Sequence, residues 1–210
     1  MRAFWLVIAM LAGCEASKSR QLDHDLVHVS PGAELRTDTV GDGKFTDTAT
    51  FVLVDAENTA SEGAYVTLGG ELDDASGAKV AELRPQSLWI PARASRTFAL
   101  IDRDRQPRPT AARATLYVRG AVIQQPPVAD ITTQREVTDD GKIVVQGTLA
   151  NPAARGASVL VIASFHDADG RPMTRPFALV HVEPGASQAV QFVGPPGSKH
   201  GQLFVGDEVY

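Results

Sequence analysis

Apolar and polar positions alternate along several short stretches of the chain. The clearest stretch runs from Ser158 to His166. Its odd-numbered positions hold the apolar residues Val159, Val161, Ala163 and Phe165. A period of two with β-branched residues is typical of a half-buried strand, so we expect this set to face a core.

The same pattern occurs a second time, earlier in the chain. Asn58–Gly77 aligns without a gap on Asn151–Gly170, from the opening Asn to the closing Asp-x-x-Gly. In the earlier copy the inward set is Val66, Leu68, Gly70 and Leu72. Asp bonds its own backbone and Gly tolerates a positive φ, so each Asp-x-x-Gly predicts a turn after the strand. The chain therefore contains a duplicated unit.

Further short strands and turns surround each copy. Pro91 aligns with Pro184 at the same offset, and we expect a turn at each proline. Short strands at hairpin spacing predict an all-β fold of two tandem Ig-like antiparallel β-sandwich domains. We place them at 26–122 and 129–210, joined by a proline-rich linker at 123–128.

The two copies differ on the outward face of the shared strand. The earlier copy has Tyr65, Thr67, Gly69 and Glu71, whereas the later copy has Ser158, Leu160, Ile162 and Ser164. Because a solvated strand face should be polar, Leu160 and Ile162 need to be covered. Either the first domain or a neighbouring loop covers them, or they form a surface for a protein partner or a second copy.

The N-terminus has the pattern of an export signal. Arg2 precedes a short apolar run, which ends in Leu11-Ala12-Gly13-Cys14 and resembles the lipobox of bacterial lipoproteins. The resemblance implies a signal peptide at 1–13, lipidation of Cys14 and a flexible tether through residue 25. In the enterobacterial sorting scheme Asp after the lipidated Cys retains a lipoprotein in the inner membrane. Glu15 stands there instead, so we expect a lipid-anchored protein of the bacterial envelope at the outer membrane.

The remaining composition narrows the chemistry. The formal net charge is −5 and no basic stripe is present, which argues against nucleic-acid binding. Cys14 is the only cysteine, so we expect no internal disulfide and no cysteine-based catalysis. The pair His166–Asp167 is adjacent on a strand, which places the two side chains on opposite faces. We predict no catalytic residues, no metal site and no cofactor.

Acidic residues near the two turns suggest a competing interpretation. Asp73-Asp74 and Asp167-Ala168-Asp169 could supply oxygen ligands for calcium, but the EF-hand spacing is missing and a turn explains the same residues. We interpret Asp102-Arg103-Asp104-Arg105 as a solvated loop whose charges neutralise each other. Trp89, the only tryptophan beyond the signal segment, is either filler for a core or domain interface, or a platform for a ligand.

A family likeness accompanies the repeat. Val145-x-Gly147-x-x-x-Asn151, the alternating apolar strand and Ala163-x-Phe165-x-Asp167-Ala168-x-Gly170 resemble the small Ig-like FxLYD-type domains of bacterial lipoproteins. His166 replaces the Tyr that precedes the Asp in that family. The resemblance implies an extracytoplasmic sandwich and brings no catalytic residues.

These observations predict a membrane-anchored lipoprotein that acts as a non-catalytic protein-binding or scaffolding module. The alternative is an accessory lipoprotein that binds a small ligand or carbohydrate at the domain junction.

Overall fold

The computed structural model describes residues 20–40 and 46–209, and nearly all of them belong to strands or the turns between strands. The first part of the chain forms β1 (Arg20–Gln21), a 3-10 turn η1 (His24–Leu26), β2 (Val27–Val29), β3 (Glu34–Val40), β4 (Asp47–Asn58), β5 (Ala64–Asp73), β6 (Lys79–Ile90), β7 (Ala94–Ile101) and β8 (Arg113–Ile123). The second part forms β9 (Asp130–Asp139), β10 (Lys142–Ala150), β11 (Ala157–His166), β12 (Pro172–Thr174), β13 (Phe177–Val182), β14 (Ser187–Val193) and β15 (His200–Val209).

The first part is a sandwich of two antiparallel sheets. In one sheet β4 lies between β7 and an interrupted edge strand made of β2 and β3. The other sheet has the order β1-β8-β5-β6. The chain changes sheet between β4 and β5 and again between β6 and β7, which is the Greek-key connection of Ig-like sandwiches.

The second part repeats this topology, except that β1 has no counterpart. One sheet has the order β14-β10-β9, and in the other β11 lies between β15 and an interrupted edge strand made of β12 and β13. Here β10 takes the place of β4 and β11 the place of β5. The predicted all-β fold of two tandem β-sandwiches is therefore confirmed.

The alternating pattern explains why both copies form sandwiches. Val66, Leu68 and Leu72 in β5 are fully buried, and so are Val159, Val161, Ala163 and Phe165 in β11. All lie on the face that was expected to point inward. Burying these side chains is the main driving force for closing the two sheets on each other.

One buried asparagine occupies the same position in both copies. The side chain of Asn58 donates to the carbonyls of Glu62, Ile90 and Pro91, and its Oδ1 accepts from the N–H of Ala60. Asn151 makes the equivalent bonds, to the carbonyls of Arg155, Val182 and Glu183 and from the N–H of Ala153. Each amide thus ties the loop before the core strand to the turn after its neighbour.

These bonds correct the alignment of the two prolines. Pro91 and Glu183 accept the same bond, so Pro91 corresponds to Glu183 and not to Pro184. The left-handed positions agree, because Arg93 has φ 54° and Gly185 has φ 66°. The sequence alignment is therefore off by one residue beyond the core strand.

The first sandwich begins earlier than expected. Arg20 and Gln21 pair with Ile123 and Val122 of β8, and Leu22 is buried in the core of the first sandwich. The prediction of a tether through residue 25 is wrong for 20–25, because an apolar Leu22 anchors this segment. Residues 14–19 lie outside the described part of the chain.

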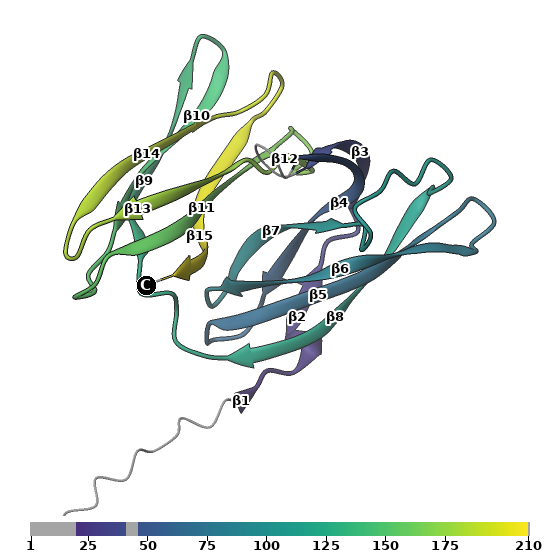
Figure 1. Ribbon diagram of the computed structural model, residues 1–210, viewed down its shortest axis with the longest axis horizontal. Coiled ribbons are helices and arrows are strands. Elements are labelled where there is room, and N and C mark those ends of the chain that lie inside the picture. Colours follow the sequence, from purple (N-terminus) through teal and green to yellow (C-terminus); the bar gives the residue numbers. More distant parts are fainter. Residues whose placement is uncertain (1–19, 41–45, 210) are drawn as a thin grey trace, which may run out of the picture.

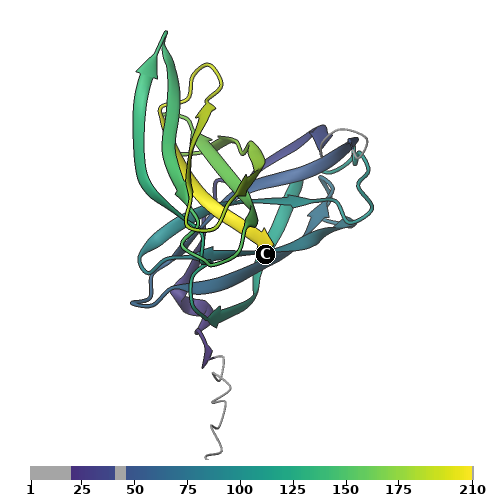
Figure 2. The ribbon, with the colours of Figure 1, turned by 60° about the vertical axis from the view of Figure 1, so that its left-hand side comes forward.

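The two sandwiches lie side by side and are joined by the connection between β8 and β9 (Figure 1). The β9–β10 hairpin, green in Figure 2, rises away from the first sandwich. The sheet that contains β11 and β15 faces the first sandwich.

Candidate functional site: the junction between the two sandwiches

An apolar contact joins the two sandwiches. Ile162 of β11 and Phe204 of β15 belong to the same buried cluster as the core of the first sandwich, and Leu160 packs against it half-buried. Ile162 is 0% exposed. The hypothesis of a free partner surface is therefore wrong for Ile162, which the first domain covers, whereas Leu160 is covered only in part.

Polar contacts surround this apolar centre. His166 Nε2 lies 3.0 Å from Asp55 Oδ2, and Thr97 donates to the other oxygen of that carboxylate at 2.5 Å. Arg175 Nε donates to the Thr97 carbonyl at 2.6 Å. Arg36 donates to the carbonyl of Met173. The interface thus combines apolar burial with directional bonds, which fixes the two sandwiches as one unit.

No local signal in the sequence could have paired His166 with Asp55, because the two residues are 111 positions apart. Both residues are polar at outward positions of half-buried strands, where solvent exposure is the usual outcome. Their burial follows only from the docking of the second sandwich.

An interdomain groove of about 610 Å³ runs along one side of this contact. Its apolar wall comes from the outward positions Phe51, Leu53, Ala99 and Ile101 of the first sandwich and from Leu160 and Phe177 of the second. The groove is therefore a continuation of the domain interface that the second sandwich does not fill.

Strand β13 borders the groove with unusual side chains. Phe177 is 48% exposed and Leu179 is 70% exposed, and they lie opposite Ile162 and Leu160 on the same sheet face. β13 pairs only with β11 among the described strands, so its outer edge is open. An open edge with exposed apolar side chains is a feature that folded proteins normally avoid.

A second hollow, the junction cleft, lies on the connection side of the interface. It has a volume of about 210 Å³ and is lined by Trp89 and Arg96 of the first sandwich, by the Pro126-Pro127 connection, and by Asp130, Gln134 and Phe204 of the second. The predicted ligand platform, Trp89, is half-buried here, and its indole ring packs against Gly63.

Arg96 is the charged residue deepest in the junction cleft. Its guanidinium carbon lies 5.0 Å from the centroid of the Phe204 ring. Burial lowers the pKa of Arg96 to about 10, and the nearby carboxylate of Asp130 partly opposes this shift. The group therefore remains charged at neutral pH in a poorly hydrated place.

Two hydrogen-bond donors in the cleft wall lack an acceptor. Arg96 Nε and Trp89 Nε1 are both shielded from water and have no hydrogen-bond partner among the described residues. Buried donors of this kind are rare, and each calls for a physical explanation.

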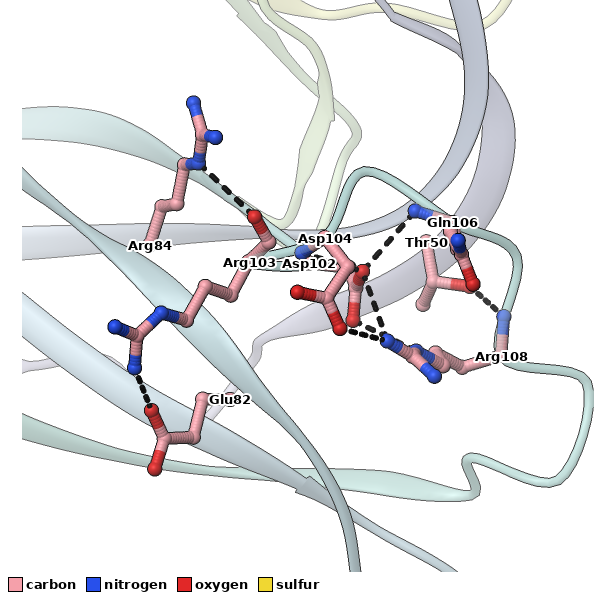
Figure 3. A network of polar contacts seen from close by, with 8 residues as sticks. All are labelled: Thr50, Glu82, Arg84, Asp102, Arg103, Asp104, Gln106 and Arg108. Atoms are coloured by element: carbon pink, nitrogen blue, oxygen red, sulfur yellow. Dashed lines mark hydrogen bonds and ion pairs between the residues drawn. The ribbon is translucent and has the colours of Figure 1, made fainter.

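The charged loop after β7 differs from its prediction (Figure 3). Asp102 is 0% exposed, and its carboxylate accepts from Arg108 Nε at 2.8 Å and from the N–H groups of Asp104 and Gln106 at 3.0 Å each. Burial opposes ionisation, but these bonds outweigh it and hold the pKa of Asp102 below its ordinary value. The interpretation as a solvated loop is wrong for Asp102, which organises the loop, and holds for the exposed Arg103 and Asp104.

The two Asp-x-x-Gly turns follow their prediction. Asp74 Oδ1 accepts from the N–H groups of Ser76 and Ala78, and Asp167 Oδ1 accepts from those of Asp169 and Arg171. Gly77 and Gly170 have positive φ angles of 90° and 75°. Among the described residues, no group of three or more His, Cys, Asp or Glu side chains is arranged to hold a metal ion.

The predicted lipidation site, Cys14, and the signal segment at 1–13 lie outside the described residues. Within 20–40 and 46–209, no helix has the length and apolarity needed to cross a membrane.

Comparisons with known proteins add little to this geometry. No family model matches the chain, and no curated protein does. One similar solved structure is the N-terminal CBM22-1-CBM22-2 tandem domain of Xyn10C from Paenibacillus barcinonensis, which is aligned over 90% of this chain and 88% of that one. The sequence identity is 8% and the TM-score is 0.15, so this likeness carries no argument about the site. The likeness to FxLYD-type domains stays a prediction.

Proposed function

We propose that the chain is a lipid-anchored, non-catalytic binding module of the bacterial envelope, and that its partner is a protein. The partner docks an extended segment along the open edge of β13 and places apolar side chains in the interdomain groove. The lipidated Cys14 holds the module at the membrane, and residues before Arg20 connect the anchor to the first sandwich.

One observation carries the proposal. Six large apolar or aromatic side chains are strongly exposed among the described residues, namely Leu26, Tyr117, Val128, Phe177, Leu179 and Val193. Two of these, Phe177 and Leu179, share one short edge strand beside a groove of about 610 Å³. An added strand would satisfy the open backbone groups of β13 while its alternate side chains enter the groove.

The edge also favours an extended segment over a helix. Phe177, Leu179 and His181 point outward at every second position, whereas Val180 and Val182 pack into the core of the second sandwich. A period of two on the receiving strand matches the period of two of a β-strand ligand. This face continues into the buried Ile162 and the half-buried Leu160, which supports the proposal because the same surface already packs against another sandwich.

The test is photocrosslinking of the full chain in its own envelope. A photoreactive side chain at Leu179 is expected to give one adduct of defined mass, and Phe177→Asp in the same chain should abolish it. Tyr117→Asp is the matched control, because Tyr117 is 52% exposed on the other sandwich. An adduct that survives Phe177→Asp, or that Tyr117→Asp removes equally, contradicts docking at β13.

The anchor is tested separately. Cys14→Ser is expected to release the chain from the membrane fraction while its unfolding midpoint stays unchanged, because residue 14 precedes β1, the first strand that the structure describes. Retention of this variant in the membrane would contradict lipid anchoring.

A second candidate function is the binding of a small ligand at the junction. The observation that favours it is the junction cleft of about 210 Å³, which Trp89 lines together with polar groups of both sandwiches. Polar groups that converge on a hollow between domains are typical of ligand sites.

A further inference from the structure

We propose that the junction cleft binds a small carboxylate ligand, with Arg96 as the residue that holds the anion. This inference rests on the second candidate function and specifies its ligand class. It is independent of docking at β13, since Phe177 and Leu179 line no part of this cleft.

Arg96 brings a positive charge to the cleft. Its Nη1 donates to the carbonyl of Ser95 at 2.9 Å, and no carboxylate among the described residues lies within 4.0 Å to form an ion pair with it. The contact with the ring of Phe204 offsets only part of the cost of burying a guanidinium. Because Nη1 is bonded to Ser95 and Nε is shielded from water, Nη2 is the group left to donate to an anion such as a carboxylate.

A neighbouring side chain, Gln134, adds hydrogen-bond donors to the cleft. Gln134 accepts from the N–H of Leu203 at 3.0 Å through Oε1, so its amide N–H groups remain for a ligand oxygen. Trp89 Nε1 is shielded from water and its edge of the indole packs against Gly63, so Trp89 contributes its ring and not this donor. The cleft therefore offers an anion the Arg96 guanidinium and the Gln134 amide.

The volume of the cleft limits the size of the ligand. A volume of 210 Å³ holds about seven water molecules at roughly 30 Å³ each. A short dicarboxylate such as malonate has a comparable number of non-hydrogen atoms, so it serves as a probe. The rings of Trp89 and Phe204 form apolar walls on which the carbon chain of the probe can pack.

Asp130 brings a negative charge to the cleft, which opposes the binding of an anion. It is the one carboxylate among the lining residues, and its Oδ1 accepts from the N–H of Ile131 at 2.8 Å. Its charge repels an incoming anion. Removing the charge with Asp130→Asn should therefore strengthen binding, whereas removing the charge of Arg96 should weaken it.

The experiment uses the full chain with Trp5→Phe, so that Trp89 is the only fluorescent indole. Malonate is titrated at constant ionic strength, and malonamide serves as the neutral probe of the same shape. We expect saturable change in Trp89 emission with malonate and none with malonamide. Arg96→Gln should weaken malonate binding by about tenfold or more, Arg96→Lys less, and Asp130→Asn should tighten it several-fold.

Arg119→Gln is the matched control, because Arg119 is exposed on β8 and does not line the cleft, so the substitution should leave binding unchanged. Since Arg96→Gln could disturb the interface, its far-ultraviolet circular dichroism and unfolding midpoint are compared with those of Arg96→Lys. Equal binding of malonate to the wild type and to a folded Arg96→Gln variant would overturn the assignment of Arg96. Equal binding of malonate and malonamide would overturn the anion class and leave a ligand site in place, whereas binding of neither would overturn both.

Discussion

The sheet that contains β5 and the sheet that contains β11 carry matching core residues on one side and contrasting residues on the other. Thr67 and Gly69 in β5 occupy the places of Leu160 and Ile162 in β11. Tyr117 of β8 pairs with Gly69 of β5, and Phe204 of β15 pairs with Ile162 of β11. Tyr117 is 52% exposed, whereas Phe204 is 2% exposed against the first sandwich.

The sheet that contains β4 and the sheet that contains β10 differ in the opposite way, because here the apolar outward residue is in the first sandwich. Leu53 in β4 is 2% exposed beside the second sandwich, and its counterpart in β10 is Gln146, which is bonded to Arg135 and Gln191 on an open face. Each sandwich thus has one face that docks and one that is polar. The two polar faces lie at the ends of the pair, as the outer faces of capping repeats do in repeat proteins.

Outward side chains, rather than the fold, decide which face docks. Both copies keep the same buried asparagine and the same Asx turns. The interface follows from a few apolar residues at strand positions that are polar in the other copy.

The largest effect is expected where the docking face is broken. Ile162→Asp places a carboxylate at a site that is 0% exposed inside an apolar cluster, so the free energy of unfolding should fall by on the order of 4 kcal/mol. We expect the single urea-unfolding transition to separate into two, because the sandwiches lose their mutual contact. Thr67→Asp on the equivalent face should change the free energy of unfolding by less than about 0.5 kcal/mol. A cooperative, wild-type transition for Ile162→Asp would show that the interface does not couple the two sandwiches.

A smaller effect is expected from the loop between β7 and β8, which is longer than the equivalent connection between β14 and β15. Asp102→Asn keeps the shape but removes the negative charge and one of the two oxygens that accept from Arg108 and from two N–H groups, so stability at neutral pH should fall by about 3 kcal/mol.

The same substitution should also change the pH dependence. The pKa of Asp102 is lower in the folded chain than its ordinary value, so its contribution is present above the unfolded pKa of about 3.9 and is lost as pH falls through the folded pKa. Chemical unfolding between pH 6 and pH 3 should therefore show a shallower decline for Asp102→Asn than for the wild type. Parallel declines would mean that Asp102 is not the group that titrates.

The sequence predicted the features that depend on neighbouring residues. The strands follow from a period of two, and the turns at Asp74 and Asp167 follow from the Asp-x-x-Gly pattern, because both signals are local. The Ig-like topology then follows from strand spacing and duplication.

What the sequence could not predict depends on distant partners. Asp102 is buried because the loop closes over Thr50, whose hydroxyl accepts from the N–H of Arg108 across 58 positions. The choice between the two interpretations of Ile162 required the position of the first sandwich. The alignment at Pro184 failed because residue identity was followed, whereas the backbone there is set by the left-handed φ of Gly185.

The smallest effect on stability, and the sharpest test of the comparison, comes from transplanting the docking side chains. Thr67→Leu with Tyr117→Phe gives the first sandwich two apolar outward residues at the places of Leu160 and Phe204. Because both positions are solvent-accessible, the free energy of unfolding should change by less than about 0.5 kcal/mol. The new apolar patch should instead cause self-association, measured by sedimentation velocity over a range of concentrations. Tyr117→Phe alone is the control. If the double variant sediments as the wild type does, side-chain polarity is insufficient, and the shape difference between Gly69 and Ile162 also decides which face docks.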